Sequence, residues 1–412
     1  MSEPSNNAAN QDQRLVDHGV DEDHNYELIN MEDVPQHINQ YGLEGIEEFF
    51  TKKLEDWKDV VINIAITGNS GAGKSSFINA IRGLGNDDEG AAETGPTETT
   101  TDPTKYPHPT NSKIKFWDLP GVGTPNYPAE TYCEKVGLKN YDTFLILAAT
   151  RFTENDLKLA RIVQTIKKSF FFVRTKIDID VWNESKKRSF NEKALLKKIK
   201  ENCVKNLKEF ESKEEDVFLI SNDEADKWDF ARLTQAILDV LPMRQRESLT
   251  LAINLLTTRS KGILKRKVEI LRCRIWKVAT ASGAGAVIPV PGLSVALDVA
   301  LLIKEVNFYK SQLGLPDENS YEFNNMTPEI KEKVRKFCLT SAVQLGNLMA
   351  AYTASSAVEE FTRFIPFVGS IIAGGISFSS TYYFLHGCLK EMEETALDIL
   401  ECLNESLVDD VE

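Results

Sequence analysis

The chain has 412 residues, of which 42% are hydrophobic, so it is long enough to form two or three domains with buried cores. Asp and Glu number 62 against 48 Lys and Arg, and the formal net charge of −14 argues against a nucleic-acid partner, which needs a basic surface. The six cysteines stand singly, without metal-ligand spacing or a disulfide framework, which is typical of a reduced, intracellular protein.

The N-terminal stretch MSEPSNNAANQDQR is polar, lacks the apolar core of a signal peptide and has no glycine after Met for N-myristoylation. Its composition predicts a disordered tail over residues 1–25. Residues 26–59 predict an N-terminal helical segment, because apolar side chains recur at helical spacing at Leu43, Ile46, Phe50, Leu54 and Trp57.

The spacing of apolar residues then changes. VVINIAIT (60–67) is rich in β-branched residues and predicts a buried strand, followed by a glycine-rich turn and the helix SSFINAIRGL. Helical stretches separate the last three of the further strands, which we predict at 113–119, 143–149, 169–175 and 216–221. Alternating strands and helices predict an α/β domain over residues 60–242, with a doubly wound, mostly parallel sheet covered on both faces.

Beyond Pro242 the strand pattern ends, and residues 243–412 predict an all-α helical domain that the N-terminal segment joins. Its first part is an amphipathic helix over residues 245–277. Two apolar segments, 285–303 and 364–385, follow, each close to the roughly 20 residues that a membrane-spanning helix needs. Asp298 and two prolines in the first, and the many Gly and Ser residues of the second, favour buried helices, and membrane insertion is the alternative.

The stretch TGNSGAGKSS (67–76) has the Gly-x-x-x-x-Gly-Lys-Ser pattern of a phosphate-binding P-loop, between a strand and a helix as that loop requires. Glycines allow backbone angles that let amide groups converge on phosphate oxygens at a helix N-terminus. Lys74 supplies charge for the β- and γ-phosphates, and the Ser75 hydroxyl is a ligand for Mg²⁺. The predicted nucleotide-binding residues here are Gly68, Asn69, Ser70, Gly71, Ala72, Gly73, Lys74, Ser75 and Ser76.

The stretch FWDLPGVG (116–123) ends a strand with Asp-x-x-Gly. Asp118 is predicted to hold Mg²⁺ through water, and the Gly121 amide to sense the γ-phosphate. The polar, Thr-rich residues 91–105 before it lie where a mobile switch brings a threonine hydroxyl to Mg²⁺. Thr100 is our first choice for this ligand, and the spacing leaves open Thr94, Thr97, Thr99 and Thr101.

The stretch VRTKID identifies the base, with Thr175, Lys176 and Asp178 at the end of another strand. A carboxylate at Asp178 accepts hydrogen bonds from guanine N1 and N2, a donor pair that adenine lacks, so GTP and GDP are favoured over ATP. Lys176 can lie along the base, and Thr175 stands where this pattern usually has Asn. Ser221 and Asn222 lie where a loop backing the base is expected.

The residue after Gly121 is Val122, where many GTPases have a Gln that orients the attacking water. Hydrolysis must therefore be slow, or another group must act. Glu98 lies in the switch region and has a suitable functional group, and contact with a second molecule would assemble it into the site. We predict Lys74, Glu98 and Thr100 as the catalytic residues.

These motifs together resemble the interferon-inducible immunity-related GTPases. The resemblance lies in AITGNSGAGKSSFINAIRGLGNDDEGAAETG, KFWDLPGVGTPNYPAETY, LAATRFTENDLKLA and FFFVRTKID, and it is strong over residues 42–245. It implies a P-loop GTPase domain of the Ras-like kind with an all-α domain built from the N- and C-terminal segments. Lys74 is similar to that of the members whose P-loop reads Gly-Lys-Ser.

The resemblance implies a dynamin-like enzyme that self-associates in the GTP state, hydrolyses GTP cooperatively and acts on membranes of pathogen-containing vacuoles. Such a protein is cytoplasmic and partly associated with intracellular membranes. In the family, a glutamate aligning with Glu98 takes part in hydrolysis across a dimer of GTPase domains, and threonines aligning with Thr94 and Thr100 lie in the same switch.

Two alternatives stay open. The alternative function is that of a slowly hydrolysing, GTP-dependent regulator or scaffold that controls other GTPases, which the missing Gln allows. The basic run KKRSFNEKALLKKIK (186–200) is typical of the solvated face of a helix, with contact to anionic lipid as the alternative. The same holds for the basic residues of the helix expected at 245–277.

Overall fold

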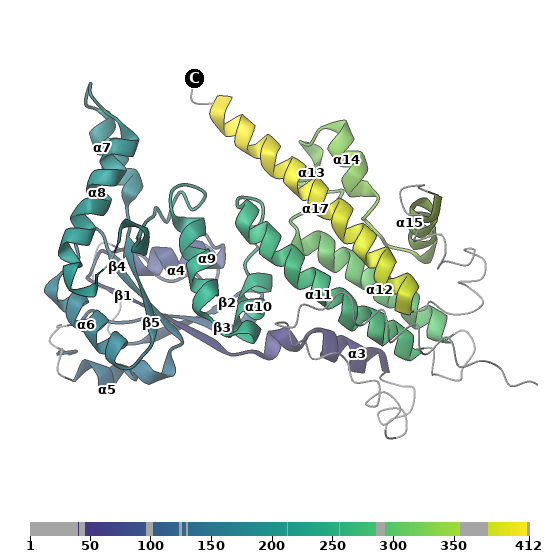
Figure 1. Cartoon of the computed structure of the whole chain (residues 1–412), viewed down its shortest axis with the longest axis horizontal. Coiled ribbons are helices and arrows are strands. Elements are labelled where there is room, and N and C mark those ends of the chain that lie inside the picture. Colours follow the sequence, from purple (N-terminus) through teal and green to yellow (C-terminus); the bar gives the residue numbers. More distant parts are fainter. Residues whose placement is uncertain are drawn as a thin grey trace, which may run out of the picture.

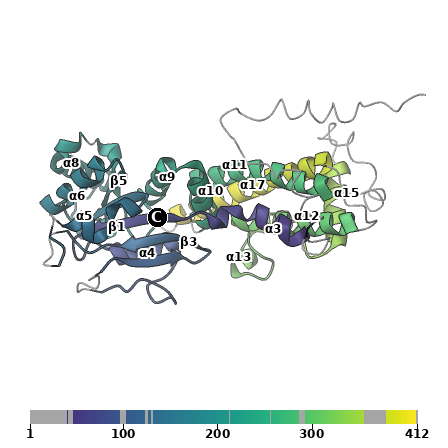
Figure 2. The same cartoon turned by 90° about the horizontal axis from the view of Figure 1, so that it is seen from below.

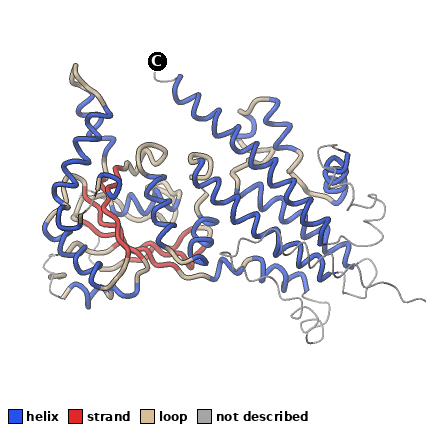
Figure 3. Tube along the Cα trace, in the orientation of Figure 1, coloured by secondary structure: helices blue, strands red, loops and turns tan. Residues whose placement is uncertain are grey.

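The computed structural model describes residues 40, 46–95, 102–122, 126–128, 131–211, 213–254, 256–285, 293–354 and 378–409. Figure 1 shows an α/β lobe at the left and a lobe of long helices at the right. The colouring of Figure 3 places every described strand in the first lobe. The predicted fold class, an α/β GTPase-like domain joined to an all-α domain, is confirmed.

The sheet has six strands in the order β2-β3-β1-β4-β5-β6. All neighbours are parallel except β2 and β3. The five predicted strands are confirmed. β2 was not predicted, and residues 104 and 105 at its start lie in the predicted switch region. The strands are β1 (Ile62–Gly68), β2 (Thr104–His108), β3 (Asn111–Asp118), β4 (Thr143–Ala148), β5 (Ser169–Arg174) and β6 (Val217–Leu219).

The unpredicted β2 is an edge strand of five residues, TKYPH, most of which are at least partly exposed. An edge strand needs hydrogen bonds on one side only, so it tolerates Pro107 and needs no apolar run. Its sequence therefore lacks the pattern by which a buried strand is recognised, although Tyr106 pairs directly with Phe116 of β3.

Helices cover both faces of the sheet. On one face, α4 (Lys74–Arg82) and α9 (Phe230–Val240) pack against Ile62, Ile64 and Ile66 of β1. The opposite face, which includes Ala65 of β1, carries α5 (Tyr132–Val136), α6 (Glu154–Thr165), α7 (Ile177–Ser185) and α8 (Glu192–Asn206). Short 3-10 turns lie at Leu138–Asn140, Lys208–Phe210 and Glu214–Asp216.

The second lobe contains α11 (Lys261–Gly285), α12 (Leu293–Gln312), α13 (Tyr321–Asn324), α14 (Pro328–Arg335), α15 (Ala342–Ala354) and α17 (Phe378–Asp409). The two longest, α11 and α17, run side by side in both views (Figures 1 and 2). They are antiparallel, since Lys261 pairs with Glu401 at 2.8 Å and Arg272 pairs with Glu393 at 2.8 Å.

The prediction of one helix over residues 245–277 is wrong. The structure has α10 (Met243–Ala252), a connection, and then α11 from Lys261. The connection turns so that Ile253 and Leu256 enter the core beneath the sheet. Burial of these two apolar side chains favours the break over continuous helix.

The helix α10 contributes to the cores of both lobes. Leu249 and Ala252 pack in the core beneath the sheet, whereas Leu251 packs with the long helices. Gln245 donates to the Val61 carbonyl at the start of β1, at 3.0 Å. The domain boundary that we place at residue 242 stays a prediction, because α10 joins the two lobes through a shared, buried helix.

The two apolar segments lie partly outside the described residues, at 286–292 and 364–377. The remainder of the first begins α12, where the Asp298 carboxylate accepts a hydrogen bond from the Ser282 hydroxyl of α11 at 2.7 Å. The remainder of the second begins α17, where the Thr381 hydroxyl donates to Ser282 at 3.0 Å. Within the described residues, we find no helix with the length and apolar character to span a membrane.

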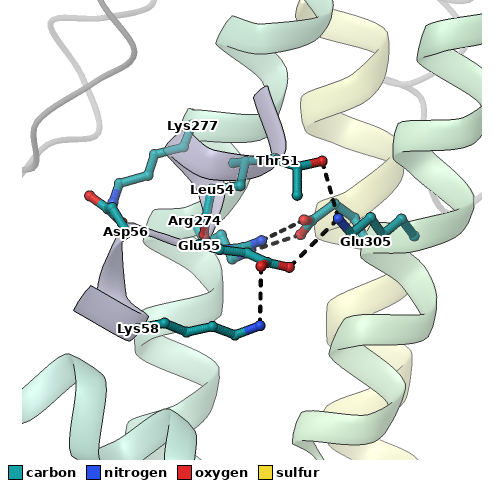
Figure 4. A network of polar contacts seen from close by, with 9 residues as sticks. Thr51, Leu54, Glu55, Asp56, Lys58, Arg274, Lys277 and Glu305 are labelled. Atoms are coloured by element: carbon teal, nitrogen blue, oxygen red, sulfur yellow. Dashed lines mark hydrogen bonds and ion pairs between the residues drawn. The ribbon is translucent and has the colours of Figure 1, made fainter. Parts of the chain in front are cut away.

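The N-terminal segment packs on the second lobe through α3 (Ile46–Leu54) and the 3-10 turn η1 (Asp56–Asp59). Figure 4 shows the polar contacts that fix it. Arg274 of α11 donates to both carboxylate oxygens of Glu305 on α12, at 3.0 and 2.7 Å, and also to the Leu54 carbonyl. Lys277 pairs with Asp56 at 3.5 Å.

The Arg274–Glu305 pair is almost completely buried, with side-chain exposures of 7% and 1%. Burial opposes the Arg274 charge, but the charge and hydrogen bonds of Glu305 outweigh it and the pKa of Arg274 is raised. A charge buried in this way is stable only while its partner is present.

Removal of Arg274 should therefore destabilise the helical lobe strongly. We expect Arg274→Ala to lower the free energy of unfolding by about 3–5 kcal/mol, because Glu305 is left buried without its partner. The matched control is Arg272→Ala on the same helix, whose ion pair with Glu393 is half exposed and should contribute less than about 1 kcal/mol. Urea denaturation measures both; equal losses would contradict the assignment.

A second expectation concerns pH. His108, at the end of β2, is buried, and its Nδ1 accepts a hydrogen bond from the Thr110 amide at 3.3 Å, which requires the neutral ring. Burial, with the charges of Arg82 and Lys267, lowers the pKa of His108 from 6.5 to about 4. In the unfolded chain His108 is protonated below about pH 6.5, whereas in the folded chain it is protonated only below about pH 4.

The stability that neutral His108 contributes should thus be complete above pH 6.5 and be lost as the pH falls toward 4. We expect the difference in unfolding free energy between the natural chain and His108→Gln to change by up to about 3 kcal/mol over this range. Denaturation at several pH values measures it, and parallel curves for the two proteins would contradict the prediction.

Candidate nucleotide site

The P-loop connects the end of β1 to the start of α4. Gly68 has φ 142°, and a Cβ there would collide with the Leu147 carbonyl oxygen of β4. Gly73, the N-cap of α4, has φ 83°, and a Cβ there would lie 2.9 Å from the Asn222 side-chain nitrogen. Both positions therefore need glycine for their backbone angle and for the close approach of neighbouring chain.

Side-chain donors bond several carbonyl groups of this loop. Lys74 Nζ lies 3.2 Å from the Gly68 oxygen and 3.5 Å from the Asn69 oxygen. The Thr175 hydroxyl donates to Ala72 at 2.7 Å, and the Asn222 amide donates to Gly73 at 3.0 Å. The first N–H groups of α4 have no partner within the helix, so this end of the loop presents donors suited to phosphate.

The predicted metal ligands Ser75 and Asp118 lie together. The Ser75 hydroxyl donates to the Asp118 carboxylate at 2.9 Å, and Asp118 is 1% exposed at the end of β3. Hydroxyl and carboxylate oxygens are the ligands that Mg²⁺ takes alongside nucleotide phosphates and water. The described residues hold no cluster of three or more His, Cys, Asp or Glu that would form an all-protein metal site. The arrangement fits Mg²⁺ bound together with a nucleotide.

The switch residues are only partly described. Thr94, near the start of the predicted switch, is exposed, and Gly121 is buried three residues beyond Asp118. Glu98 and Thr100 lie outside the described residues, as do Thr97, Thr99 and Thr101. Their predicted roles in hydrolysis and metal binding stay predictions.

The predicted base-binding residues gather beside the P-loop. Asp178 lies in the first turn of α7, and its Oδ1 is buried without a hydrogen-bond partner in the described structure. An unpaired buried acceptor fits the N1 and N2 donors of guanine, which would satisfy it. Lys176, at the N-cap of α7, has the left-handed φ of 62°, a backbone conformation that non-glycine residues adopt mainly where the surroundings impose it.

Thr175 stands where this motif usually has Asn, and it keeps the base loop in contact with the P-loop. Thr175 is fully buried, and its hydroxyl makes the bond to the Ala72 carbonyl described above. Ser221 is also fully buried, and its hydroxyl accepts from the amides of Asp223 and Glu224 at 3.2 Å each. It shapes the loop from which Asn222 reaches the P-loop.

Sequence reasoning missed two sets of residues around this site. Arg174, which is 5% exposed, donates to the Thr175 carbonyl and to the Asp180 carboxylate at 2.5 Å, and so supports the guanine loop from behind. In the sequence, Arg174 is only a basic residue at the end of a strand, and nothing there predicts these contacts. The second set, Thr153 and Asp156, contacts Asn69 of the P-loop, and its Thr-x-x-Asp spacing is a capping pattern that was available in the sequence.

A glycine-rich loop between β1 and α4, a buried Asp118 beside Ser75 and an unpaired Asp178 define the class: this is a P-loop GTPase. The family model described as interferon-inducible GTPase (IIGP) matches residues 29–402. The chain belongs to the interferon-inducible GTPase family, as its motifs predicted, and it is a GTPase.

The similarity to individual members extends over most of the chain. This chain is 34% identical over 370 residues to mouse interferon-gamma-inducible GTPase 10, covering 88% of this chain and 87% of that protein. It is 36% identical over 346 residues to rat interferon-inducible GTPase 5, covering 81% of this chain and 74% of that protein. Among solved structures, Arabidopsis thaliana Toc33 gives a TM-score of 0.30 at 19% identity, covering 43% of this chain and 77% of that one.

The Asp178 carboxylate, whose Oδ1 is buried and unpaired, should determine which base is bound. We expect Asp178→Asn to lower the affinity for GTP and GDP by about a hundredfold, because the charged acceptor for guanine N1 and N2 is lost. Xanthine nucleotides should gain affinity, since the 2-oxo group accepts from the new amide. Lys74→Ala is the control and should lower the affinity for every base alike. Titration with fluorescent nucleotides measures this; unchanged GTP affinity in Asp178→Asn would refute the assignment.

Proposed function

We propose that this GTPase associates with itself in the GTP state, completes its catalytic site in that association, and acts at intracellular membranes in cell-autonomous defence. The observation behind the proposal is the position that follows Gly121. Val122 is 8% exposed and packs with Leu119, Tyr127 and Tyr132 in the apolar core on the sheet face that carries α5 and α6. A buried valine cannot orient the attacking water, so hydrolysis needs a group supplied from elsewhere.

Glu98 is the residue we propose for that task. It lies between the P-loop and β2, in the switch region of the sequence, and has a carboxylate that can orient water or take its proton. A second GTPase domain docked over the nucleotide would bring the switch to the γ-phosphate and exclude water from the site. This makes the turnover of one molecule depend on the presence of another.

The surface near the base supports a protein contact there. On α7, which begins at the guanine loop, Ile179 is 47% exposed and Trp182 is 64% exposed. Exposed aromatic and aliphatic side chains of this kind are enriched where proteins associate. Association across this side of the domain would cover the base loop and the nucleotide together.

We further propose that Mg²⁺ binds with the nucleotide, held by Ser75, Asp118 and a switch threonine, of which Thr100 is the first choice. The 2.9 Å contact between Ser75 and Asp118 supports this. The ion would supply positive charge at the phosphates. We also assign the chain to the Gly-Lys-Ser subclass on Lys74 and Ser75, whose side chains both lie in the P-loop geometry described above.

A slowly hydrolysing regulator of other GTPases is the second candidate. The buried Val122 favours it equally, because a site without its own water-orienting residue holds GTP for a long time. The two candidates differ in whether the chain activates itself.

The dependence of turnover on protein concentration distinguishes them. We expect GTP turnover per molecule to rise with concentration in the natural chain, and Glu98→Ala to lose that rise and at least about tenfold in rate, the usual contribution of a positioned acid or base. Phosphate release under saturating GTP measures both. Flat, slow turnover in the natural chain would favour the regulator, and an unchanged Glu98→Ala would refute the role of Glu98.

Membrane association has a separate test. On α8, Lys197 and Lys198 are exposed, whereas Lys200 pairs with Asp229 at 3.0 Å. If α8 contacts anionic lipid, the double variant Lys197→Glu/Lys198→Glu should bind phosphatidylserine vesicles at least about tenfold more weakly, given about 1 kcal/mol for each basic residue. The control makes the same charge change at Lys52 and Lys53 of α3. Equal vesicle binding by all three proteins would leave α8 as a solvated helix.

A further inference from the structure

Asp156 is a buried carboxylate beside the P-loop, with no part in the nucleotide contacts assigned above. It is 5% exposed and occupies the third position of α6. Its Oδ2 accepts from both the amide and the hydroxyl of Thr153, at 2.8 Å each. Thr153 and Asp156 therefore form a capping box, which satisfies amide groups at the start of α6.

A further donor reaches this capping box from the P-loop. The Asn69 side-chain amide donates to Asp156 Oδ2 at 3.2 Å and to the Thr153 hydroxyl at 3.2 Å, across 87 and 84 residues of sequence. A capping box is complete without such a donor. The contact therefore serves the P-loop rather than the helix.

Asn69 connects this carboxylate to the phosphate-binding lysine. Its backbone oxygen lies 3.5 Å from Lys74 Nζ, and its side chain is bonded to Asp156 and Thr153. The neighbouring Gly68 is pressed against the Leu147 carbonyl of β4, from which the chain continues toward α6. The P-loop is thus braced at consecutive residues, by the backbone of β4 and by the capping box of α6.

The electrostatic environment agrees with this geometry. Burial raises the pKa of Asp156, and the hydrogen bonds from Thr153 and Asn69 together with the Lys74 charge act in the opposite direction. The negative charge is therefore stabilised by the donors that surround it, and loss of one of them leaves it less well satisfied.

We propose that Asp156 is a positioning residue for the nucleotide site: through Asn69 it holds the first turn of the P-loop in the conformation that keeps Lys74 directed along the phosphates, and so slows nucleotide release. It touches no reacting atom. The inference rests on nucleotide binding at the P-loop.

The test is the release rate of a fluorescent GDP analogue, chased with unlabelled GDP. We expect Asn69→Ala and Asp156→Ala each to raise the rate about tenfold, the effect of losing one hydrogen bond to a charged acceptor. Because both residues act through one contact, the double variant should release no faster than the faster single variant. The matched control is Glu154→Ala, which removes an exposed carboxylate from the same turn of α6 and should leave the rate within about twofold.

Asp156→Asn should give an intermediate rate, because the amide oxygen accepts the same bonds without the charge. If Asp156→Ala lowers the melting temperature and leaves release unchanged, its role is helix capping alone and the proposal is wrong. If the release rates of the two single variants multiply in the double variant, the proposal is also wrong. Asn69→Ala leaves the capping box intact, so it decides the question even if Asp156→Ala does not fold. Failure of the natural chain to bind GDP would instead refute the nucleotide site itself.

Discussion

The nucleotide site depends on one requirement: every carbonyl of the P-loop that turns away from the phosphates must find a donor, because a buried, unpaired peptide group is strongly unfavourable. Three side chains meet it for four of these carbonyls. Lys74 bonds the carbonyls of Gly68 and Asn69, Thr175 bonds Ala72, and Asn222 bonds Gly73. The loops predicted to recognise guanine therefore also shape the P-loop, so we expect base recognition and phosphate binding to depend on each other.

A comparable dependence ties the ends of the chain together in the second lobe. The N-terminal residues 51–58 lie against α11 and α12, and their contacts include the buried Arg274–Glu305 pair and the Leu54 carbonyl (Figure 4). Trp57 and Leu54 bury their side chains in the same helical core. The helical lobe is thus completed by residues that precede the GTPase domain in the chain. Because α10 packs in the cores of both lobes, its burial stabilises both of them.

Much of the fold and site could be predicted because the information is local. A run of β-branched residues, a glycine-rich turn and a helix are each recognisable within about ten residues, and the P-loop follows from them. The order of Asp118 and Asp178 along the chain then identified guanine. The assignment of residues 98 and 100 rests on sequence alone.

The misses share a different physical origin. β2 is an edge strand containing Pro107, so it needs no apolar pattern, and the helix break after Ala252 is decided by burial of Ile253 and Leu256 in a distant core. The bracing of Asn69 by Asp156 joins residues 87 apart, and the contact of Arg174 with Asp180 depends on how the chain turns from β5 into α7. Such contacts belong to the tertiary structure, and a single sequence without its fold does not specify them.

The β2–β3 hairpin has a mechanical consequence. At one end Thr104 pairs with Asp118, the predicted metal ligand, and at the other Thr110 and Asn111 bond α10 through Ala252 and Ser248. The hairpin is a hydrogen-bonded ribbon of roughly 17 Å, given about 3.3 Å for each residue of a strand. The hairpin thus connects α10 to Asp118 through strand pairing and side-chain hydrogen bonds. A ligand that binds at Asp118 therefore lies at one end of a hairpin whose other end is bonded to α10, the helix shared by the cores of both lobes.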